Sequence, residues 1–182
     1  MQTDFGDVYK EHVWQVYGYL AYRVSSRAEA EDLTQATFER ALRAWNRYDA
    51  RRASVRTWLL TIARNLLIDQ RRKGGGRRSV SLESPSIGES DLPTGPGPKE
   101  TSLGLSPDLA SALEKLKGRE RSVLALRFGG DLQTTEIARM LDLSVANVQQ
   151  ILSRALRKLR QDLEGQAGSE DAGNPGRVAG QG

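Results

Sequence analysis

Apolar residues recur every three or four positions over the first 73 residues, which is the spacing of helices with one buried face. The pattern predicts three or four helices there, three of them over residues 4–23, 30–45 and 54–73. The third helix is expected to have two contrasting sides. Its core-facing side carries Val55, Trp58, Leu59, Ile62 and Leu66, and its opposite side carries Thr57, Thr61, Arg64, Ile68 and Arg71.

The stretch AEDLTQATFERALRAW, residues 30–45, combines two stripes on one predicted helix. The apolar stripe already supplies a face for the core. The ordered polar stripe therefore indicates a surface that is presented to something else. The apolar stripe contains Thr34, Phe38, Ala41, Leu42 and Trp45, and the polar stripe contains Asp32, Gln35, Glu39 and Arg43.

A second helical block begins near Pro107, a favourable residue for the first turn of a helix. Gly129 and Gly130 interrupt this block, and a threonine cap then opens a short helix. A turn at Asp142 follows, and Ser144 is a good N-cap for a longer helix. A short helix, a tight turn and a longer capped helix predict a helix-turn-helix. The short helix is expected to bury Ile137, Ala138 and Leu141, and the longer one Val145, Val148, Leu152, Ala155, Leu156 and Leu159.

Two segments lack helical periodicity and are rich in Gly, Ser or Pro. Residues 74–106 are expected to form a flexible linker, and residues 165–182 a disordered tail. The predicted architecture is all-α, with helical domains over residues 1–73 and 107–164.

The charge distribution supports this division. The chain of 182 residues has a net charge of +4. The net charge is +4 over residues 1–73, −1 over the linker and +2 over residues 107–164. Two separate basic blocks favour polyanionic partners.

Composition also excludes several classes of protein. The chain has no cysteine, so disulfides and thiolate zinc sites are excluded, and a reducing cytoplasm is a compatible location. There is no apolar run long enough to span a bilayer and no signal-peptide pattern at the N-terminus. No catalytic constellation, phosphate-binding glycine loop or cofactor motif is present, and the lone His12 has no partner cluster for a metal. An enzyme is not expected.

Polar faces of the two blocks are candidates for nucleic-acid binding. Amides on the last helix of the helix-turn-helix are suited to base edges, and its cations to phosphates. The alternative is a helical hairpin whose polar face meets water. The basic side of the helix over residues 54–73 is likewise either a nucleic-acid surface or a solvated face. Trp58 lies on the apolar stripe, which favours a core position over base stacking.

Taken in order, four motifs resemble the extracytoplasmic-function (ECF) sigma factors of bacterial RNA polymerase, in the sigma-70 family. They are AEDLTQATFERALRAW, SVRTWLLTIARNLLIDQRRK, LKGRERSVLALRF and TTEIARMLDLSVANVQQILSRALRKLR. The resemblance covers nearly the whole chain outside the linker and the tail.

The resemblance implies a role for each block, with core RNA polymerase and promoter DNA as partners. The first block would be region 2, in which the polar stripe Asp32, Gln35, Glu39 and Arg43 docks on the clamp of the largest polymerase subunit. The second block would be region 4, which reads the minus-thirty-five element and rests on the polymerase flap. The linker would run toward the active-site cleft. An anti-sigma factor is a further implied partner, since such factors commonly hold members of this family inactive.

The resemblance also implies sets of DNA-contacting residues. The loop after the second helix and the start of the third would capture a flipped base of the minus-ten element and contact its backbone. The residues implied there are Tyr48, Asp49, Arg51, Arg52, Ser54, Arg56, Arg64, Asn65 and Arg71. Those implied for the minus-thirty-five element are Thr134, Ala146, Asn147, Gln149, Gln150, Ser153, Arg154 and Arg157.

Four positions depart from the family pattern. Ala36 stands where the docking helix usually has Glu, and Asp142 stands in the turn where Gly is common. Gln149 and Ile151 stand where Lys and Arg are frequent, which is expected to weaken salt-dependent DNA binding by the second domain. A stand-alone helix-turn-helix regulator remains the main alternative, and a sigma-like protein that only sequesters partners is another.

Overall fold

A computed structural model describes residues 4–74 and 105–171, except for the side chains of residues 73–74 and 166–171. All regular structure in these ranges is helical, which confirms the all-α class. The first domain contains α1 (Phe5–Ala21), α2 (Arg27–Ala44), the 3₁₀ turn η1 (Trp45–Arg47) and α3 (Val55–Gly74). The second contains α4 (Pro107–Glu114), α5 (Gly118–Leu124), the π-helical turn η3 (Ala125–Gly129), α6 (Thr134–Leu141) and α7 (Val145–Asp171).

The predicted linker lies almost entirely outside the described residues, as does the tail beyond Asp171. Helix α7 continues to Asp171. The prediction of a tail without structure from Gly165 onward is therefore wrong for residues 165–171, because the helical backbone of α7 runs through them.

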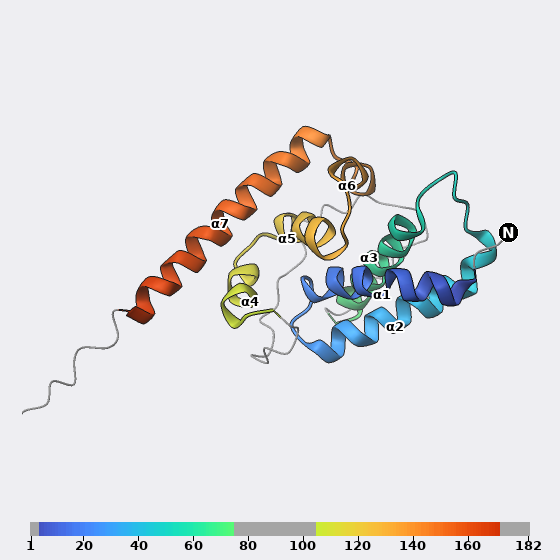
Figure 1. The fold of residues 1–182 in the computed structure, drawn as a ribbon, viewed down its shortest axis with the longest axis horizontal. Coiled ribbons are helices and arrows are strands. Elements are labelled where there is room, and N and C mark those ends of the chain that lie inside the picture. The colour runs from blue at the N-terminus through green and yellow to red at the C-terminus, as the bar shows by residue number, and fades with distance from the viewer. Residues whose placement is uncertain (1–3, 75–104, 172–182) are drawn as a thin grey trace, which may run out of the picture.

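Helices α1, α2 and α3 pack together around large buried side chains (Figure 1). Helix α2 begins where the side chain of Ser26 accepts a hydrogen bond from the backbone N–H of Glu29. Ser54 caps α3 in the same way, through the N–H of Thr57. The fully buried side chains of this core include Val16, Tyr19, Leu20, Leu59 and Leu67.

The buried face of α3 is wider than its sequence pattern indicates. Leu60 and Ala63 are fully buried, although they do not belong to the predicted stripe, while Trp58 and Ile62 are only half-buried. The reason is that α3 is covered from two sides, by the other helices of its domain and by the helix-turn-helix domain. Leu60, for example, lies against Gly130.

The helix-turn-helix is built from α6 and α7. The backbone N–H of Gln133 donates to the carboxylate of Glu136 at 2.9 Å, so Gln133 precedes α6 as its cap and the expected threonine cap is wrong. Asp142 ends α6 in the left-handed conformation with φ 53°, in place of the Gly common in the family. Ser144 accepts from the N–H of Asn147, as expected for the cap of α7.

The inward face of α7 differs from its prediction at three positions. Val145 is 39% exposed and Leu156 is 45% exposed, although both were expected in the core. Ile151 is 8% exposed and belongs to the core, although it was not among the residues expected to be buried and was treated as a position that lacks a DNA-binding cation. Helix α7 crosses α5 and α6 at an angle (Figure 1), so its contact line follows Val148, Ile151 and Ala155.

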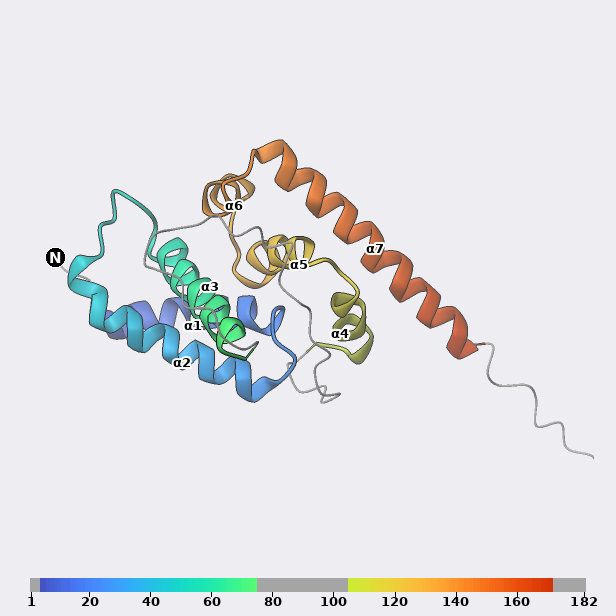
Figure 2. The same ribbon diagram turned by 180° about the vertical axis from the view of Figure 1, so that it is seen from behind.

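The two domains pack against each other and share one hydrophobic core. Leu126, Leu132 and Ile137 from the second domain join Leu59 and Leu60 of α3 in this core. Seen from behind, α6 lies beside the start of α3 (Figure 2). A smaller core between α4, α5 and α7 holds the rest of the second domain together. Among the described residues, no helix is sufficiently long and apolar to cross a membrane.

Replacing Asp142 with Gly is expected to raise stability. The left-handed conformation costs a residue with a Cβ about 1–2 kcal/mol, whereas Gly loses about 0.5–1 kcal/mol of chain entropy on folding. Urea unfolding should therefore show a gain of about 0.5 kcal/mol. Asp142→Ala, which keeps the Cβ and lacks the polar group, serves as the matched variant and should be less stable than wild type. A Gly variant less stable than the Ala variant would contradict the assigned turn geometry.

Candidate functional site

The polar stripe of α2 is exposed along its length. Asp32, Gln35, Glu39 and Arg43 all face solvent, and the amide of Gln35 donates to the carboxylate of Glu39 at 2.9 Å. On the opposite side, the hydroxyls of the buried Thr34 and Thr37 donate to backbone carbonyls one turn earlier. The helix thus presents charged groups outward on a backbone fixed by its buried face, which is Ala30, Leu33, Thr34, Thr37, Phe38 and Ala41.

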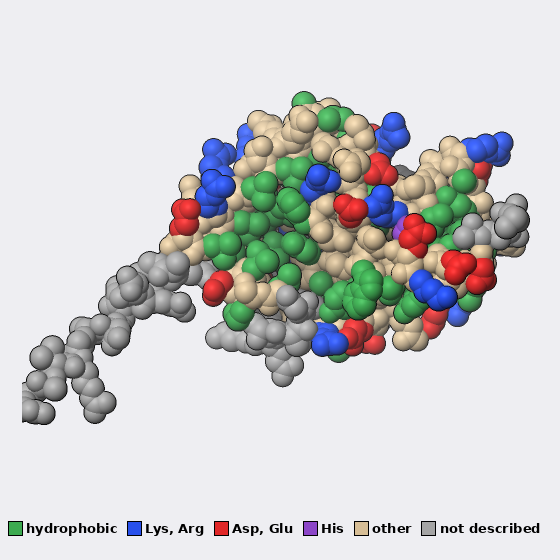
Figure 3. Space-filling view, in the orientation of Figure 1, with side chains coloured by type: hydrophobic (Ala, Val, Ile, Leu, Met, Phe, Trp, Pro, Cys, Tyr) green, Lys and Arg blue, Asp and Glu red, His purple; other side chains and the backbone are tan. Residues whose placement is uncertain are grey.

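A groove of about 770 Å³ runs beside this stripe, between α1 and α2. Leu42, expected in the core, lines the groove instead and is 57% exposed. Trp14 lines it from α1 and is 74% exposed. Apolar side chains gather over this part of the surface among charged groups (Figure 3). Such a combination of apolar floor and polar rim is typical of protein-docking surfaces. Trp14 was not predicted as a site residue. Its only signal in the sequence is a large aromatic side chain away from Val8, Val13, Val16 and Leu20, which recur at helical spacing.

An aromatic cluster fixes the loop between α2 and α3. The ring of Tyr48 stacks on Trp45 at 5.1 Å with an interplanar angle of 3°, and Trp58 packs against both rings. The hydroxyl of Tyr48 donates to the carbonyl of Ala53 at 2.9 Å and closes the loop. Trp58 is thus half-buried against the core.

The candidate DNA residues of this loop differ in their availability. Asp49 accepts from both the backbone and the side chain of Arg51, and these hydrogen bonds lower the pKa of the Asp49 carboxyl. The Asp49 carboxylate is therefore partly neutralised within the loop. Arg51 and Arg52 are exposed, as is Ser54 at the start of α3.

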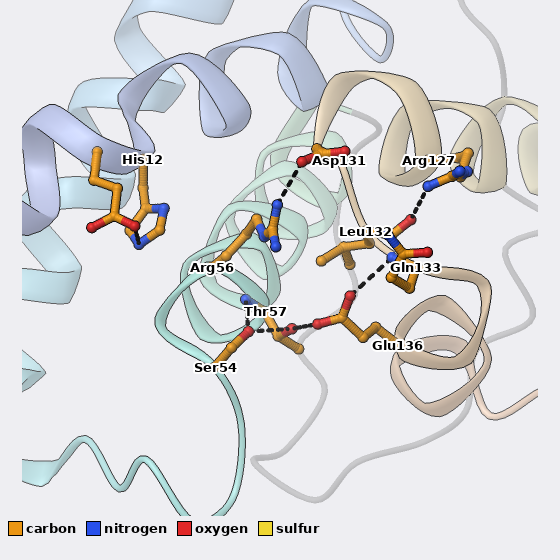
Figure 4. A network of polar contacts seen from close by, with 10 residues as sticks. His12, Ser54, Arg56, Thr57, Arg127, Asp131, Leu132, Gln133 and Glu136 are labelled. Atoms are coloured by element: carbon orange, nitrogen blue, oxygen red, sulfur yellow. Dashed lines mark hydrogen bonds and ion pairs between the residues drawn. The ribbon is translucent and has the colours of Figure 1, made fainter.

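The candidate residues on α3 are brought only partly to the surface. Asn65 is exposed and Arg64 is half-buried. Arg56 donates to Asp131 of the second domain at 2.7 Å (Figure 4), and Arg71 donates to the carbonyl of Arg23 at 2.7 Å. In this conformation Arg56 and Arg71 hold the protein together rather than presenting free cations to DNA.

The candidate residues on α7 form an open face. Ala146, Gln149, Gln150, Ser153, Arg154 and Arg157 are exposed, and Asn147 is half-buried at the start of the helix. Thr134 of α6 is half-buried. Since Ile151 is buried, a cation missing at that position is not a missing phosphate contact, and the argument for weak binding applies to Gln149 alone.

Lys158 was a sequence candidate for phosphate contact, but the structure gives it another partner. Its ammonium lies 2.7 and 2.8 Å from the two carboxylate oxygens of Glu120. Glu120 is nearly buried and also accepts the backbone N–H of Lys117. Lys158 therefore serves mainly to compensate a buried carboxylate.

His12 is half-buried, and burial is the largest cause lowering the pKa of its imidazole. Its nearest charged partner is Glu11 at 3.9 Å. The part of the chain that the structure describes contains no group of three or more side chains suited to a metal ion.

Both helical domains match known families. Residues 8–77 match the family Sigma-70 region 2, and residues 112–161 match Sigma-70, region 4. The ECF RNA polymerase sigma factor SigL of Mycobacterium tuberculosis is 33% identical over 161 residues, which cover 86% of this chain and 87% of SigL. SigW of Bacillus subtilis is 30% identical over 172 residues, 88% of each chain. BldN of Streptomyces coelicolor is 30% identical over 155 residues, and the match spans 58% of the length of BldN.

These matches define an alternative sigma factor. The chain belongs to the ECF family of RNA polymerase sigma factors.

Solved structures share the fold. The sigma factor RpoE in its complex with the anti-sigma factor NepR from Bartonella quintana has a TM-score of 0.66 and 22% identity, covering 88% of this chain and 97% of that one. CnrH in complex with the cytosolic domain of CnrY has a TM-score of 0.62 and 24% identity, covering 88% of each chain. The paired helical domains of this chain therefore have solved counterparts.

Arg157 and Lys158 should respond differently when duplex DNA binding by the full chain is titrated at several salt concentrations. Arg157→Gln removes an exposed cation, and the slope of log K against log salt should fall by about 0.9. Lys158→Gln should change the slope by much less and should instead lower the unfolding midpoint, because the Glu120 carboxylate loses its counterion. Equal loss of slope in both variants would show that Lys158 also contacts phosphates.

Proposed function

We propose that this sigma factor binds core RNA polymerase through α2, contacts the minus-ten element through the loop before α3, and contacts the minus-thirty-five element through α7. The observation that carries the proposal is the exposed stripe Asp32, Gln35, Glu39 and Arg43 beside an open apolar groove. A helix that keeps an ordered polar face next to exposed aromatic surface is suited to a large protein partner.

In this function α2 determines the partner and the register of docking. Charged and amide groups that are fixed on a helix contribute mostly to specificity, while the apolar groove adds contact area. The clamp of the largest polymerase subunit is the partner that the family assignment favours for α2, and the flap is the partner favoured for the second domain.

The minus-ten role is divided among the loop and α3. The Trp45–Tyr48–Trp58 cluster holds the loop in place, and a rigid loop lowers the entropy cost of accepting an unstacked base. Arg52 is available for backbone phosphates, as is the amide of Asn65, and the exposed Arg51 would exchange its contact with Asp49 for a phosphate. The same surface also includes Arg56, Arg64 and Arg71. Their side chains would contact DNA after giving up their present contacts within the protein.

The minus-thirty-five role rests on α7. Exposed amides near its N-terminus are suited to base edges, and Arg154 and Arg157 one or two turns later are suited to phosphates.

The protein itself supplies recognition, and catalysis belongs to the polymerase. It acts in the cytoplasm, where polymerase is found. An anti-sigma factor is a further proposed partner, since the solved structures of RpoE and CnrH that share this fold carry NepR and CnrY.

Run-off transcription from a pool of genomic fragments tests the function directly. Core polymerase with this protein should produce discrete transcripts that are absent without it. The triple variant Asp32→Ala, Gln35→Ala, Glu39→Ala should lose them, because it removes the polar stripe from an otherwise intact helix. The control triple variant Glu114→Ala, Gln161→Ala, Glu164→Ala removes the same classes of exposed side chain elsewhere and should transcribe normally.

Two results would contradict the proposal. Equal loss in both triple variants would show that the effect is not due to the α2 stripe. No transcripts at all, together with tight duplex binding in the absence of polymerase, would indicate a stand-alone helix-turn-helix regulator.

A further inference from the structure

Arginine side chains from three parts of the chain converge where α1 ends. Arg23 follows α1, Arg71 lies near the end of α3, and Arg121 belongs to α5. The guanidinium of Arg121 donates to the carbonyl of Tyr22 at 2.6 Å, and that of Arg71 donates to the carbonyl of Arg23 at 2.7 Å. Since these two carbonyls belong to consecutive residues, Arg71 and Arg121 meet on the same short piece of backbone.

Arg23 belongs to that piece of backbone and completes the group. One terminal nitrogen of its guanidinium donates to the carbonyl of Gly118 at 3.1 Å and to the hydroxyl of Ser122. Its Nε is buried and has no hydrogen-bond partner in the part of the chain that the structure describes. A buried donor without an acceptor is uncommon and costs free energy. Arg23, Arg71 and Arg121 are called the arginine cluster below.

The arginine cluster differs in its charge balance from the other buried ion of the molecule. The buried charged side chains among the described residues are Arg23, Glu120 and Arg121. Glu120 is paired with the ammonium of Lys158 at 2.7 Å. Arg23 and Arg121 donate instead to two backbone carbonyls and one hydroxyl, which are all neutral. Buried charges in proteins are normally paired, so these two cations favour an anionic partner.

The charges of the arginine cluster lie close enough to act on one another. Burial is the largest cause lowering the pKa of Arg121, and the charges of Arg23 and Arg71 lower it further. The carboxylate of Glu114 opposes them with the smallest of these contributions. Like charges repel strongly where water is excluded, and an anion placed between them would offset that repulsion.

A close backbone contact fixes the position of the arginine cluster. A Cβ built on Gly18 would lie 2.7 Å from the carbonyl oxygen of Gly129, and one on Gly129 would lie 2.5 Å from the backbone of Gly18. This contact joins α1, one turn before Tyr22, to the turn η3 that directly follows α5. The donors of the cluster are therefore held in place before a ligand arrives, which lowers the entropy cost of binding.

We propose that the arginine cluster binds a small tetrahedral oxyanion, with inorganic phosphate as the ligand that fits its chemistry. A guanidinium presents paired N–H donors that match two oxygens of a phosphate group. The buried Nε of Arg23 gains an acceptor, and the charges of Arg23 and Arg121 gain a counterion.

Burial decides between a free anion and the phosphates of a nucleic acid. Arg23 is 3% exposed and Arg121 is 6% exposed, so a phosphate that is part of a polymer backbone cannot reach them. Arg71 and Tyr22 are half-buried and leave an approach for a small ion. The inference is thus separate from the proposed sigma function, which uses other surfaces for DNA.

Thermal unfolding of the full chain, without polymerase or DNA, tests the site. At about ten times its dissociation constant, phosphate should raise the unfolding midpoint by about 3–6 °C. Chloride at the same ionic strength should have little effect, because it lacks the paired oxygens. Phosphate also stabilises folded proteins through general exclusion from their surfaces, and that effect does not saturate. A shift that grows without saturation, or no shift, would overturn the proposal.

Calorimetric titration of variants with phosphate locates the site. Arg121→Gln keeps an N–H donor for the carbonyl of Tyr22 and removes one cation, so the affinity should fall about tenfold to a hundredfold. Arg71→Gln changes a half-buried position and should lower the affinity as well, which keeps the test decisive if Arg121→Gln fails to fold. Wild type should bind one phosphate per chain.

Arg119→Gln is the matched control. Arg119 lies on α5 with Arg121, and residues two apart on a helix do not share a face. Its loss should leave phosphate binding unchanged. Equal loss of affinity in Arg119→Gln and Arg121→Gln would show that binding follows net charge, and unchanged affinity in both Arg71→Gln and Arg121→Gln would place the ligand elsewhere. Either result would overturn the proposal.

A competition experiment separates the free anion from DNA. A short single strand of mixed sequence, added at constant ionic strength, should leave bound phosphate in place. Displacement of phosphate by the strand would assign the arginine cluster to nucleic acid and overturn the proposal. Saturable phosphate binding that is lost in Arg121→Gln would support the site even if the run-off assay refuted the sigma function.

Discussion

The close approach of Gly18 and Gly129 is the contact on which the arrangement of the two domains depends. It lets η3 lie directly on α1, and this approach brings Leu126 and Leu132 into one core with Leu59 and Leu60. The π-helical turn contributes by returning the chain sharply, with the N–H of Leu132 bonded to the carbonyl of Leu126 at 3.0 Å. Without the two glycines the apolar surfaces could not come together at this distance, and Asp131 would not reach Arg56.

The polar surfaces of the protein fall into two groups according to whether this contact uses them. The start of α3 and the end of α1 are engaged inside the protein, whereas the α2 stripe and the outer face of α7 are open. The packed arrangement therefore leaves the α2 stripe and the outer face of α7 open to partners.

Helices α1, α2 and α3 could be predicted from the sequence to within a few residues, because each is long and amphipathic, and the start of α7 could be predicted from its Ser144 cap. The exposed α2 stripe and most of the α7 face could be predicted for the same reason. The burial of Leu60 and Ile151 and the exposure of Leu156 could not be predicted. Periodicity indicates that a position is apolar without identifying the element that covers it. Likewise, the pattern classifies Arg56 and Arg71 as basic and cannot reveal that their partners lie in the protein.

The arginines at the end of α1 place buried cations inside the contact between the two domains. Burial, together with the nearby charges of Arg23 and Arg71, lowers the pKa of Arg121 to about 10, so the Arg121 side chain remains cationic at neutral pH. Backbone carbonyls and the Ser122 hydroxyl accept their hydrogen bonds, which replaces part of the lost hydration but leaves like charges close together. The apolar core therefore favours the contact between the two domains, while the buried cations oppose it.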